Sequence, residues 1–338
     1  MSHKSACAAV KMGASTTEIQ ELPLPDLQRH PEGGLLRVEA TGLCGADVMW
    51  YSRADEPTDQ PAILGHHIVG VVEELSDRAA SRLSLAVGDR ILIEEYLPCG
   101  TCVLCREGDY RFCPQTALGD PGALRYGSTP VATEPGLWGG YSEYAFLHER
   151  SVWHRLSPET STEQATLILP LSNGIQWVQW DGGIGYGDTV VIIGPGQHGL
   201  CGVIAAQAAG AANIVVLGLP GDEGRLELAR ELGAAFAGVD TAAALEMIRD
   251  ATDGQLADAV LDMAAGTTAT LEFGLDALRT GGRLLAGVWP AGATPIPLRK
   301  LATKRITLRP LRGHSYEAVD AARRAVERGN LPLDLLCT

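Results

Sequence analysis

The spacing of hydrophobic positions changes near residue 158 of the chain. Before this point, apolar and polar residues alternate in short runs, such as 35–40 and 68–72, which are separated by glycine, proline and aspartate. This alternation is typical of half-buried β-strands joined by turns. The sequence therefore predicts that residues 1–157 form a β-rich domain.

After residue 158 the pattern changes to helical segments that alternate with short, continuous apolar runs. Continuous runs indicate strands that are buried on both faces, and their alternation with helices predicts a parallel, doubly wound sheet. We assign residues 158–295 to this second domain. Its predicted strands include 189–193, 214–217, 259–261 and 283–286.

The last part of the chain, residues 296–338, lacks this alternation. It contains a short apolar run at 306–308 and a helical pattern at 316–328. We expect both segments to return to the first domain, so that the chain visits that domain twice.

Size and charge narrow the range of functions. A chain of 338 residues is longer than one hydrophobic core usually serves, and its 40 glycines are typical of an α/β protein with many turns. The formal net charge of −14 repels phosphate backbones and anionic lipids. We therefore expect a small-molecule substrate, with neither a nucleic acid nor a membrane as partner.

The segment 189–221 contains no Asp, Glu, Lys or Arg and exceeds the roughly 20 residues that span a bilayer. Pro195, Asn213 and several glycines interrupt it, which predicts a buried strand, a turn, a helix and another strand. The first ten residues contain no apolar stretch of signal-peptide length. The sequence thus predicts a cytoplasmic protein.

Four of the eight cysteines lie close together in the segment 95–115. Their C-x2-C-x2-C-x7-C spacing lets four thiolates converge on one Zn²⁺, which predicts a closed, structural zinc site. A disulfide pair or an iron–sulfur cluster also uses cysteine-rich segments and stays an alternative. The four residues are Cys99, Cys102, Cys105 and Cys113.

A glycine-rich turn follows the predicted strand 189–193 and precedes an apolar helix. In this strand–turn–helix context, G-x-G-x-x-G predicts a dinucleotide site: the first glycine allows the turn, the second admits the pyrophosphate and the third lets helix and strand pack closely. The turn reads Gly194, Pro195, Gly196, Gln197, His198, Gly199, and we assign Gly218 and Val288 to the same cofactor site.

The choice between NAD and NADP depends on the end of the second strand. An NAD enzyme usually carries an acid there, but the chain reads Leu217-Gly218-Leu219. Asp222 or Glu223 would have to reach back from the following loop, whereas Arg225 would pair with a 2′-phosphate. We expect NADP slightly more than NAD.

These motifs, together with Gly42-Leu43-Cys44-Gly45-Ala46-Asp47 and Gly65-His66-His67, resemble the zinc-containing medium-chain dehydrogenase/reductase family in order and spacing along nearly the whole chain. The resemblance implies a GroES-like catalytic domain, a Rossmann cofactor domain, a substrate cleft between them and a homodimer or homotetramer. It also implies that Cys44 and His66 are two ligands of a catalytic zinc.

The same resemblance shows where the chain departs from the family pattern. Leu169 stands at the place of the third zinc ligand, and His67 replaces the glutamate that usually follows the ligand histidine. Ala46 and Met49 stand where the family often has a proton relay. A catalytic zinc could survive through His67, but adjacent histidines in an extended segment tend to point to opposite faces.

Three functions remain open. The leading expectation is an oxidoreductase that reduces an activated C=C or C=N bond with NAD(P)H and without catalytic zinc, with Asp47, Tyr51 and His67 as candidate proton donors. The alternative is a zinc-dependent alcohol dehydrogenase in which His67 is the replacement ligand. The third possibility is a dinucleotide-binding protein that has lost its chemistry.

Overall fold

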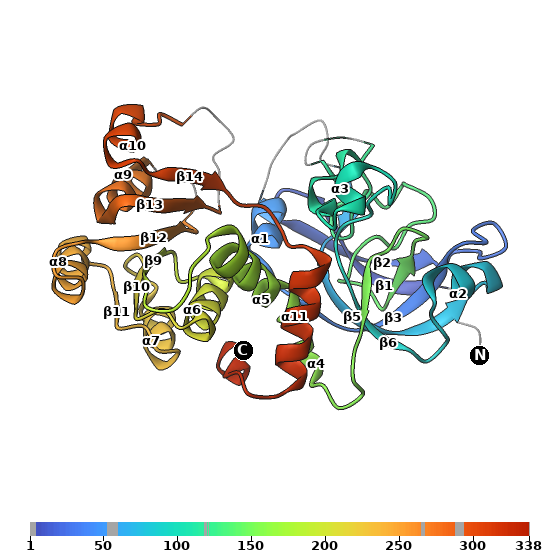
Figure 1. Ribbon diagram of the computed structural model, residues 1–338. Helices are drawn as coiled ribbons and strands as arrows, with labels where there is room; N and C mark the ends of the chain where they lie inside the picture. The colour runs from blue at the N-terminus through green and yellow to red at the C-terminus, as the bar shows by residue number, and fades with distance from the viewer. Residues whose placement is uncertain are drawn as a thin grey trace. The chain divides into compact units, whose positions relative to one another are not determined.

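The computed structural model describes residues 5–52, 60–117, 120, 122–264, 268–287 and 294–337. The chain forms two compact units (Figure 1). The first unit comprises Met1–Leu169, Ser315–Leu333 and Cys337, and the second comprises Pro170–His314, Asp334–Leu336 and Thr338.

The first unit is built on two antiparallel sheets. One has the strand order β2-β1-β4 and the other β7-β3-β5-β6-β8. Their inward-facing residues form one core with large, fully buried side chains such as Leu36, Ile68 and Trp138. The strands are β1 (Ser5–Gly13), β2 (Thr16–Pro23), β3 (Gly34–Gly42), β4 (Ala62–Ile63), β5 (His67–Leu75), β6 (Arg90–Ile93), β7 (Tyr144–Leu147) and β8 (Trp153–Arg155).

Short helices accompany these strands, and three of them begin at serine caps. The hydroxyl of Ser76 accepts a hydrogen bond from the backbone N–H of Ala79, and Ser161 and Ser315 do the same for Gln164 and Ala318. The α-helices are α1 (Gly45–Ser52), α2 (Asp77–Leu83), α3 (Val103–Arg106), α4 (Thr162–Thr166) and α11 (Tyr316–Glu327), and the 3₁₀ turns are η1 (Tyr110–Phe112) and η2 (Pro114–Thr116).

The second unit is a six-stranded parallel sheet with the order β11-β10-β9-β12-β13-β14. This order confirms the predicted doubly wound fold. Helices lie on both sides of the sheet, with α6 and α7 on one side and α8, α9 and α10 on the other (Figure 1). The elements are α5 (Ile168–Gly174), η3 (Ile175–Asp181), β9 (Thr189–Ile193), α6 (Gln197–Ala209), β10 (Asn213–Leu217), α7 (Glu223–Glu231), β11 (Phe236–Gly238), α8 (Thr241–Ala251), β12 (Ala257–Asp262), α9 (Thr268–Ala277), β13 (Leu278–Ala286), α10 (Leu298–Lys304), β14 (Thr307–Pro310) and η4 (Leu333–Leu336).

The two passages between the units lie later in the chain than residues 157 and 295, where the sequence placed the domain boundaries. The expectation that the run 306–308 returns to the first unit is wrong, because β14 pairs with β13 and completes the parallel sheet. Ile306 and Leu308 pack against the core of the second unit, which explains this placement. The part of this segment that belongs to the first unit contains α11, with its buried Val319 and Val326.

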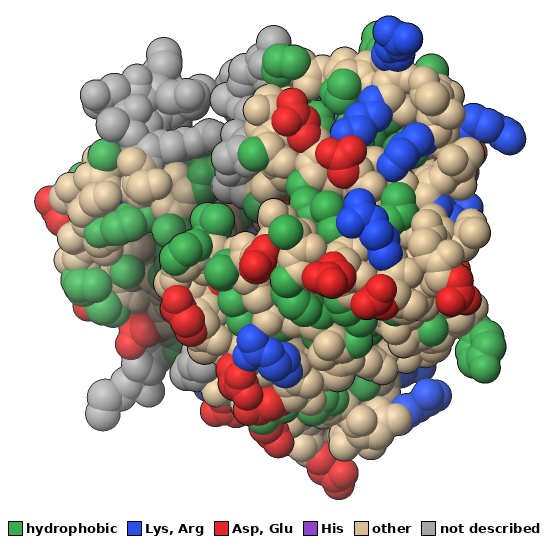
Figure 2. All heavy atoms as spheres, turned by 90° about the vertical axis from the view of Figure 1, so that its left-hand side faces the viewer, with side chains coloured by type: hydrophobic (Ala, Val, Ile, Leu, Met, Phe, Trp, Pro, Cys, Tyr) green, Lys and Arg blue, Asp and Glu red, His purple; other side chains and the backbone are tan. Residues whose placement is uncertain are grey.

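The surface carries charged side chains of both signs. Acidic and basic side chains both occur on the face shown in Figure 2, with hydrophobic side chains between them. Within the described ranges, no helix has the length and hydrophobicity needed to cross a membrane. The uncharged segment 189–221 is divided among β9, α6 and β10, and α6 ends at Gly210 in the left-handed conformation.

One close backbone approach positions the turn between β4 and β5. The N–H groups of Gly140 and Tyr141 donate to the carbonyl oxygens of Gly65 and Leu64 at 2.9 and 3.0 Å. A Cβ atom on the neighbouring Gly139 would lie 2.0 Å from the carbonyl oxygen of Ile63. Only glycine therefore lets these two segments pair.

We predict that Gly139→Ala lowers the free energy of unfolding by about 1–3 kcal/mol, because the backbone has to move apart to admit the methyl group. Chemical denaturation followed by circular dichroism measures this change. Gly13→Ala is the matched control, since a Cβ there meets nothing within 4 Å. Equal stability of the two variants would contradict the packing argument.

Candidate functional site

The four clustered cysteines form a site that fits a tetrahedral metal ion. Their sulfur atoms all lie within 4.8 Å of one another. The Sγ atom of Cys105 is 3.8 Å from that of Cys99 and 3.5 Å from that of Cys102. A zinc ion with bonds of about 2.3 Å to four thiolates holds its sulfurs about 3.8 Å apart, whereas a disulfide needs about 2.0 Å. The spacing supports zinc.

Hydrogen bonds stabilise the thiolate form of one of these cysteines, Cys99. The N–H groups of Thr101 and Cys102 donate to the sulfur of Cys99 at 3.4 and 3.3 Å, and the hydroxyl of Thr101 donates at 3.5 Å. These hydrogen bonds, the hydroxyl first, lower the pKa of Cys99 to about 5. A thiolate is the form that binds metal.

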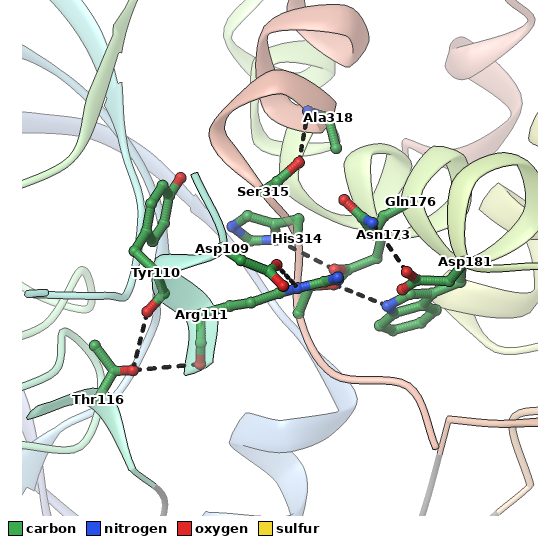
Figure 3. Close-up of polar contacts among 12 residues, drawn as sticks. Asp109, Tyr110, Arg111, Thr116, Asn173, Gln176, Asp181, His314, Ser315 and Ala318 are labelled. Atoms are coloured by element: carbon green, nitrogen blue, oxygen red, sulfur yellow. Dashed lines mark hydrogen bonds and ion pairs between the residues drawn. The ribbon is translucent and has the colours of Figure 1, made fainter. Parts of the chain in front are cut away.

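A buried carboxylate anchors this loop to the first unit. The hydroxyl of Tyr110 donates to Glu94 at 2.7 Å, and Nε2 of His154 lies 2.7 Å from the same carboxylate. Burial, and then the charge of Glu94, raise the pKa of Tyr110 well above its usual range. The hydroxyl of Thr116 closes the following turn by donating to the carbonyl of Cys113 at 2.8 Å, with the carbonyls of Tyr110 and Arg111 at 3.3 Å (Figure 3 draws the two longer contacts).

A second group of ligand atoms comes from Cys44, His66 and His67, which also lie within 4.8 Å of one another. The expectation that the two histidines point to opposite faces is wrong. Strand β5 begins at His67, so His66 lies outside it, and Gly65 before it has the left-handed φ of 86°. The two rings are therefore nearly perpendicular, with centroids 4.5 Å apart.

Asp47 organises this second group. Its buried carboxylate accepts hydrogen bonds from the backbone N–H groups of Cys44 and Gly65 at 2.9 and 3.0 Å and from the hydroxyl of Tyr141 at 3.3 Å. Nδ1 of His66 lies 3.2 Å from Asp47 Oδ1. Because a carboxylate only accepts, Nδ1 carries the proton and Nε2 remains available as a metal ligand.

The same contacts set the charges in the absence of a metal. Burial opposes ionisation of Asp47, but its hydrogen bonds, first that from His66, lower the pKa of the carboxyl. Burial also opposes protonation of His66, yet the hydrogen bonds to Asp47 and Cys44 raise its pKa to about 10. Without a metal, the site therefore favours an anionic carboxylate beside a protonated imidazole.

The other candidate residues have different positions. The hydroxyl of Tyr51 donates to the carbonyl of Ser15 at 2.8 Å, so its proton is engaged at the β1–β2 turn. Leu169 is buried near the start of α5, and Met49 is exposed on α1. Tyr141 was not among the candidates. Its only signal in the sequence is the Gly-Gly-Tyr motif at 139–141, which resembles a recurrent segment of the family.

The glycine-rich turn of the second unit has the geometry of a dinucleotide site. Gly194 has a φ of 100°, and a Cβ on Gly199 would lie 2.0 Å from its carbonyl oxygen. Gly196 caps α6 without a side-chain hydrogen bond and has open space beside it. The first N–H groups of α6 are thus available to a phosphate.

Polar groups around this turn also fit a bound nucleotide. Among the described residues, none is hydrogen-bonded to the buried Oε1 of Gln197, which a ligand hydroxyl would satisfy. The imidazole of His198 lies against Asn173, with Nε2 3.2 Å from the amide nitrogen. Val288, the last predicted cofactor residue, lies outside the described residues.

The loop after β10 brings an acid back to the end of that strand. Asp222 Oδ2 accepts from the N–H of Leu219 at 2.9 Å, and Oδ1 pairs with Arg225 at 3.0 Å. A Cβ on Gly218 would lie 3.1 Å from Asp222 Oδ2 and 3.0 Å from Cγ of Pro195. Asp222 therefore lies at the end of β10, next to the glycine-rich turn.

Comparison with known families matches both units. The model described as "Alcohol dehydrogenase GroES-like domain" matches residues 30–157, and the model described as "Zinc-binding dehydrogenase" matches residues 199–328. A probable alcohol dehydrogenase of Mycobacterium tuberculosis is 38% identical over 75% of this chain and 68% of that protein.

Two further relatives extend over most of the chain. An erythritol/L-threitol dehydrogenase of Mycolicibacterium smegmatis is 31% identical over 98% of this chain and 89% of that protein. The solved structure of an alcohol dehydrogenase from Thermus sp. ATN1 superimposes with a TM-score of 0.81 at 28% identity, over 96% of this chain and 90% of that one.

We predict that Cys102→Ser loses one zinc ion per chain and unfolds at a lower temperature, because the cysteine loop is closed by its metal. Elemental analysis and a thermal melt measure the two effects. Cys7→Ser is the matched control, because that cysteine lies on β1 and outside both clusters of ligand atoms. An unchanged zinc content in Cys102→Ser would exclude the four-cysteine site.

Proposed function

We propose a reaction for this chain, which belongs to the zinc-containing medium-chain dehydrogenase/reductase family and is an NAD(P)-dependent oxidoreductase. It interconverts an alcohol and a ketone or aldehyde at a zinc ion held by Cys44, His66 and His67. The observation that carries this proposal is the convergence of these three ligand atoms within 4.8 Å. It favours the zinc-dependent alternative over the zinc-free reduction of a C=C or C=N bond that the sequence led us to expect.

The three side chains suit a catalytic zinc site. One thiolate and two imidazoles provide three protein ligands and leave the fourth position open to substrate, which distinguishes this site from the four-cysteine site. When bound, zinc polarises the substrate oxygen, and the nicotinamide exchanges a hydride with the substrate carbon. Asp47 holds the His66 ring in the tautomer that directs Nε2 away from the carboxylate.

The surroundings of Cys44 support a substrate with an apolar part. Leu43, Val48 and Met49, which flank Cys44 in the chain, are 63%, 53% and 46% exposed. These residues are close to Cys44 in the sequence, and apolar side chains that line a substrate pocket favour a hydrocarbon substituent over a second hydroxyl. We propose a small secondary or primary alcohol of this kind, and a homo-oligomer in the cytoplasm as the sequence predicts.

We predict two zinc ions per chain in protein purified without chelator, and one in His67→Ala. The variant should also lose at least about a hundredfold in kcat/KM with alcohols, because a zinc site with two protein ligands holds the metal poorly. His30→Ala, which changes a histidine outside both clusters, is the control.

The contrary result for this site is equally specific. One zinc per chain in the wild type, together with turnover of a conjugated enone or an imine and none of alcohols, would replace the proposal with zinc-free reduction. Tight dinucleotide binding without any turnover would point to a protein that only binds the cofactor.

For the cofactor, the contacts around Asp222 favour NAD over the NADP that we expected from the sequence. The carboxylate lies at the end of β10, where an acid usually holds the ribose 2′-hydroxyl. Arg225, the group we expected to bind a 2′-phosphate, is paired with this carboxylate at 3.0 Å. A 2′-phosphate would therefore meet a negative charge.

We predict that Asp222→Ser shifts the ratio of NADPH to NADH affinity toward NADPH by roughly tenfold or more, since the like charge is removed and Arg225 is released. Titration of protein fluorescence with each nucleotide measures the ratio. Glu227→Gln removes an acid one turn further along α7 and should leave the ratio unchanged. A wild type that prefers NADPH would reverse this assignment.

A further inference from the structure

The carboxylate of Asp47 has two hydrogen-bond donors on each of its oxygens. Oδ1 lies 3.0 Å from the backbone nitrogen of Gly65 and 3.2 Å from Nδ1 of His66. Oδ2 lies 2.9 Å from the backbone nitrogen of Cys44 and 3.3 Å from the hydroxyl of Tyr141. Three of these donors belong to the segments that carry the candidate metal ligands. The hydroxyl of Tyr141 is the one that comes from a distant part of the chain.

The backbone of Tyr141 is held on both sides by hydrogen bonds. Its N–H donates to the carbonyl of Leu64 at 3.0 Å, and its carbonyl accepts from the N–H of Ala9 at 2.8 Å. These bonds connect Tyr141 to the segment before Gly65 and to β1. The backbone from which the Tyr141 ring projects is therefore fixed by pairing within the first unit and not by the metal ligands.

The ring of Tyr141 packs on the turn that leads to the two histidines. A Cβ on Gly65 would lie 2.9 Å from Cδ1 of Tyr141 and 3.0 Å from Cε1. From this contact the side chain reaches Asp47 with its hydroxyl. A carboxylate only accepts hydrogen bonds, so the hydroxyl is the donor. Burial, and then the charge of Asp47, raise the pKa of Tyr141 above its usual range, which keeps this donor protonated.

Donors on both oxygens limit the rotation of the Asp47 carboxylate about its Cβ–Cγ bond. If the carboxylate rotated, Oδ1 would move away from Nδ1 of His66, and the imidazole would lose the group that orients it. The hydroxyl of Tyr141 opposes this rotation from a fixed backbone. An imidazole that is already oriented loses less rotamer freedom when it binds a metal.

We propose that Tyr141 is a positioning residue of the alcohol site: its hydroxyl holds the Asp47 carboxylate in the orientation in which Oδ1 accepts from His66. The proposal deepens the function proposed above, since it rests on zinc binding by Cys44, His66 and His67. It concerns how tightly this site holds its ion and does not depend on the identity of the substrate or of the cofactor.

Competition for zinc with a chelator of known affinity tests this role without catalysis. Tyr141→Phe keeps the ring that packs on Gly65 and removes only the hydroxyl. We expect this variant to bind the second zinc ion roughly tenfold more weakly, at the lower end of the effect of groups that orient a metal ligand. The zinc ion of the four-cysteine site is the internal reference, and its affinity should stay unchanged.

Two controls separate this role from a merely structural one. Tyr126→Phe removes a buried hydroxyl of the same unit, which donates to the carbonyl of Phe146 at 2.7 Å, and should leave zinc affinity unchanged. Adding Tyr141→Phe to Asp47→Asn should weaken zinc binding no further, whereas a structural tyrosine would give additive losses. If thermal melts show that Asp47→Asn does not fold, the visible spectrum of cobalt-substituted Tyr141→Phe decides, since it reports a changed ligand geometry.

The outcomes separate the two proposals. Equal zinc affinity of the wild type and folded Tyr141→Phe overturns the role of Tyr141 while leaving the proposed alcohol site intact. Tighter zinc binding in the variant also overturns it, because the hydroxyl would then only reduce the negative charge that acts on His66. A wild type that holds zinc at the four cysteines alone removes the alcohol site, and with it both proposals.

Discussion

The carboxylate of Asp47 is the interaction on which the proposed alcohol site depends. Burying an anion is costly unless hydrogen bonds replace its water, and Asp47 receives them from two backbone N–H groups, one hydroxyl and one imidazole. The same bonds connect the start of α1 to the Gly65 turn. Cys44 and His66 are therefore brought together by a group that is not itself a ligand.

A buried acid also orients an imidazole at Glu94 and His154, but with a different result. Glu94 is shared between His154 and Tyr110, and His154 is stacked under Tyr316 with ring centroids 4.4 Å apart. Within the described part of the chain, these residues belong to neither cluster of ligand atoms. The residues around each acid–imidazole pair therefore determine its role. The pair of Glu94 and His154 anchors the cysteine loop, whereas the pair of Asp47 and His66 is part of a candidate metal site.

The sequence predicted best those features that depend on local spacing. Strand β9 has the predicted bounds, and the four cysteines converge because a short loop carries all of them. Strand β14 was assigned to the wrong unit, because a short apolar run does not say which core will cover it. His67 beside Cys44, and Tyr141 beside Asp47, depend on turns and on pairings across the fold, which leave no periodic signal in the sequence.

The departures from the family pattern form a coherent set once His67 is counted as a ligand. A neutral imidazole then takes the role that an anionic side chain has elsewhere, so Cys44 is the only anionic ligand of the proposed site. A divalent ion held by one thiolate and two imidazoles retains one positive charge, and this charge favours the ionised form of an alcohol bound at the open position. An alcohol that ionises more readily needs less help from a neighbouring base. Ala46 and Met49, which cannot carry a proton, are therefore compatible with dehydrogenation at a site of this charge.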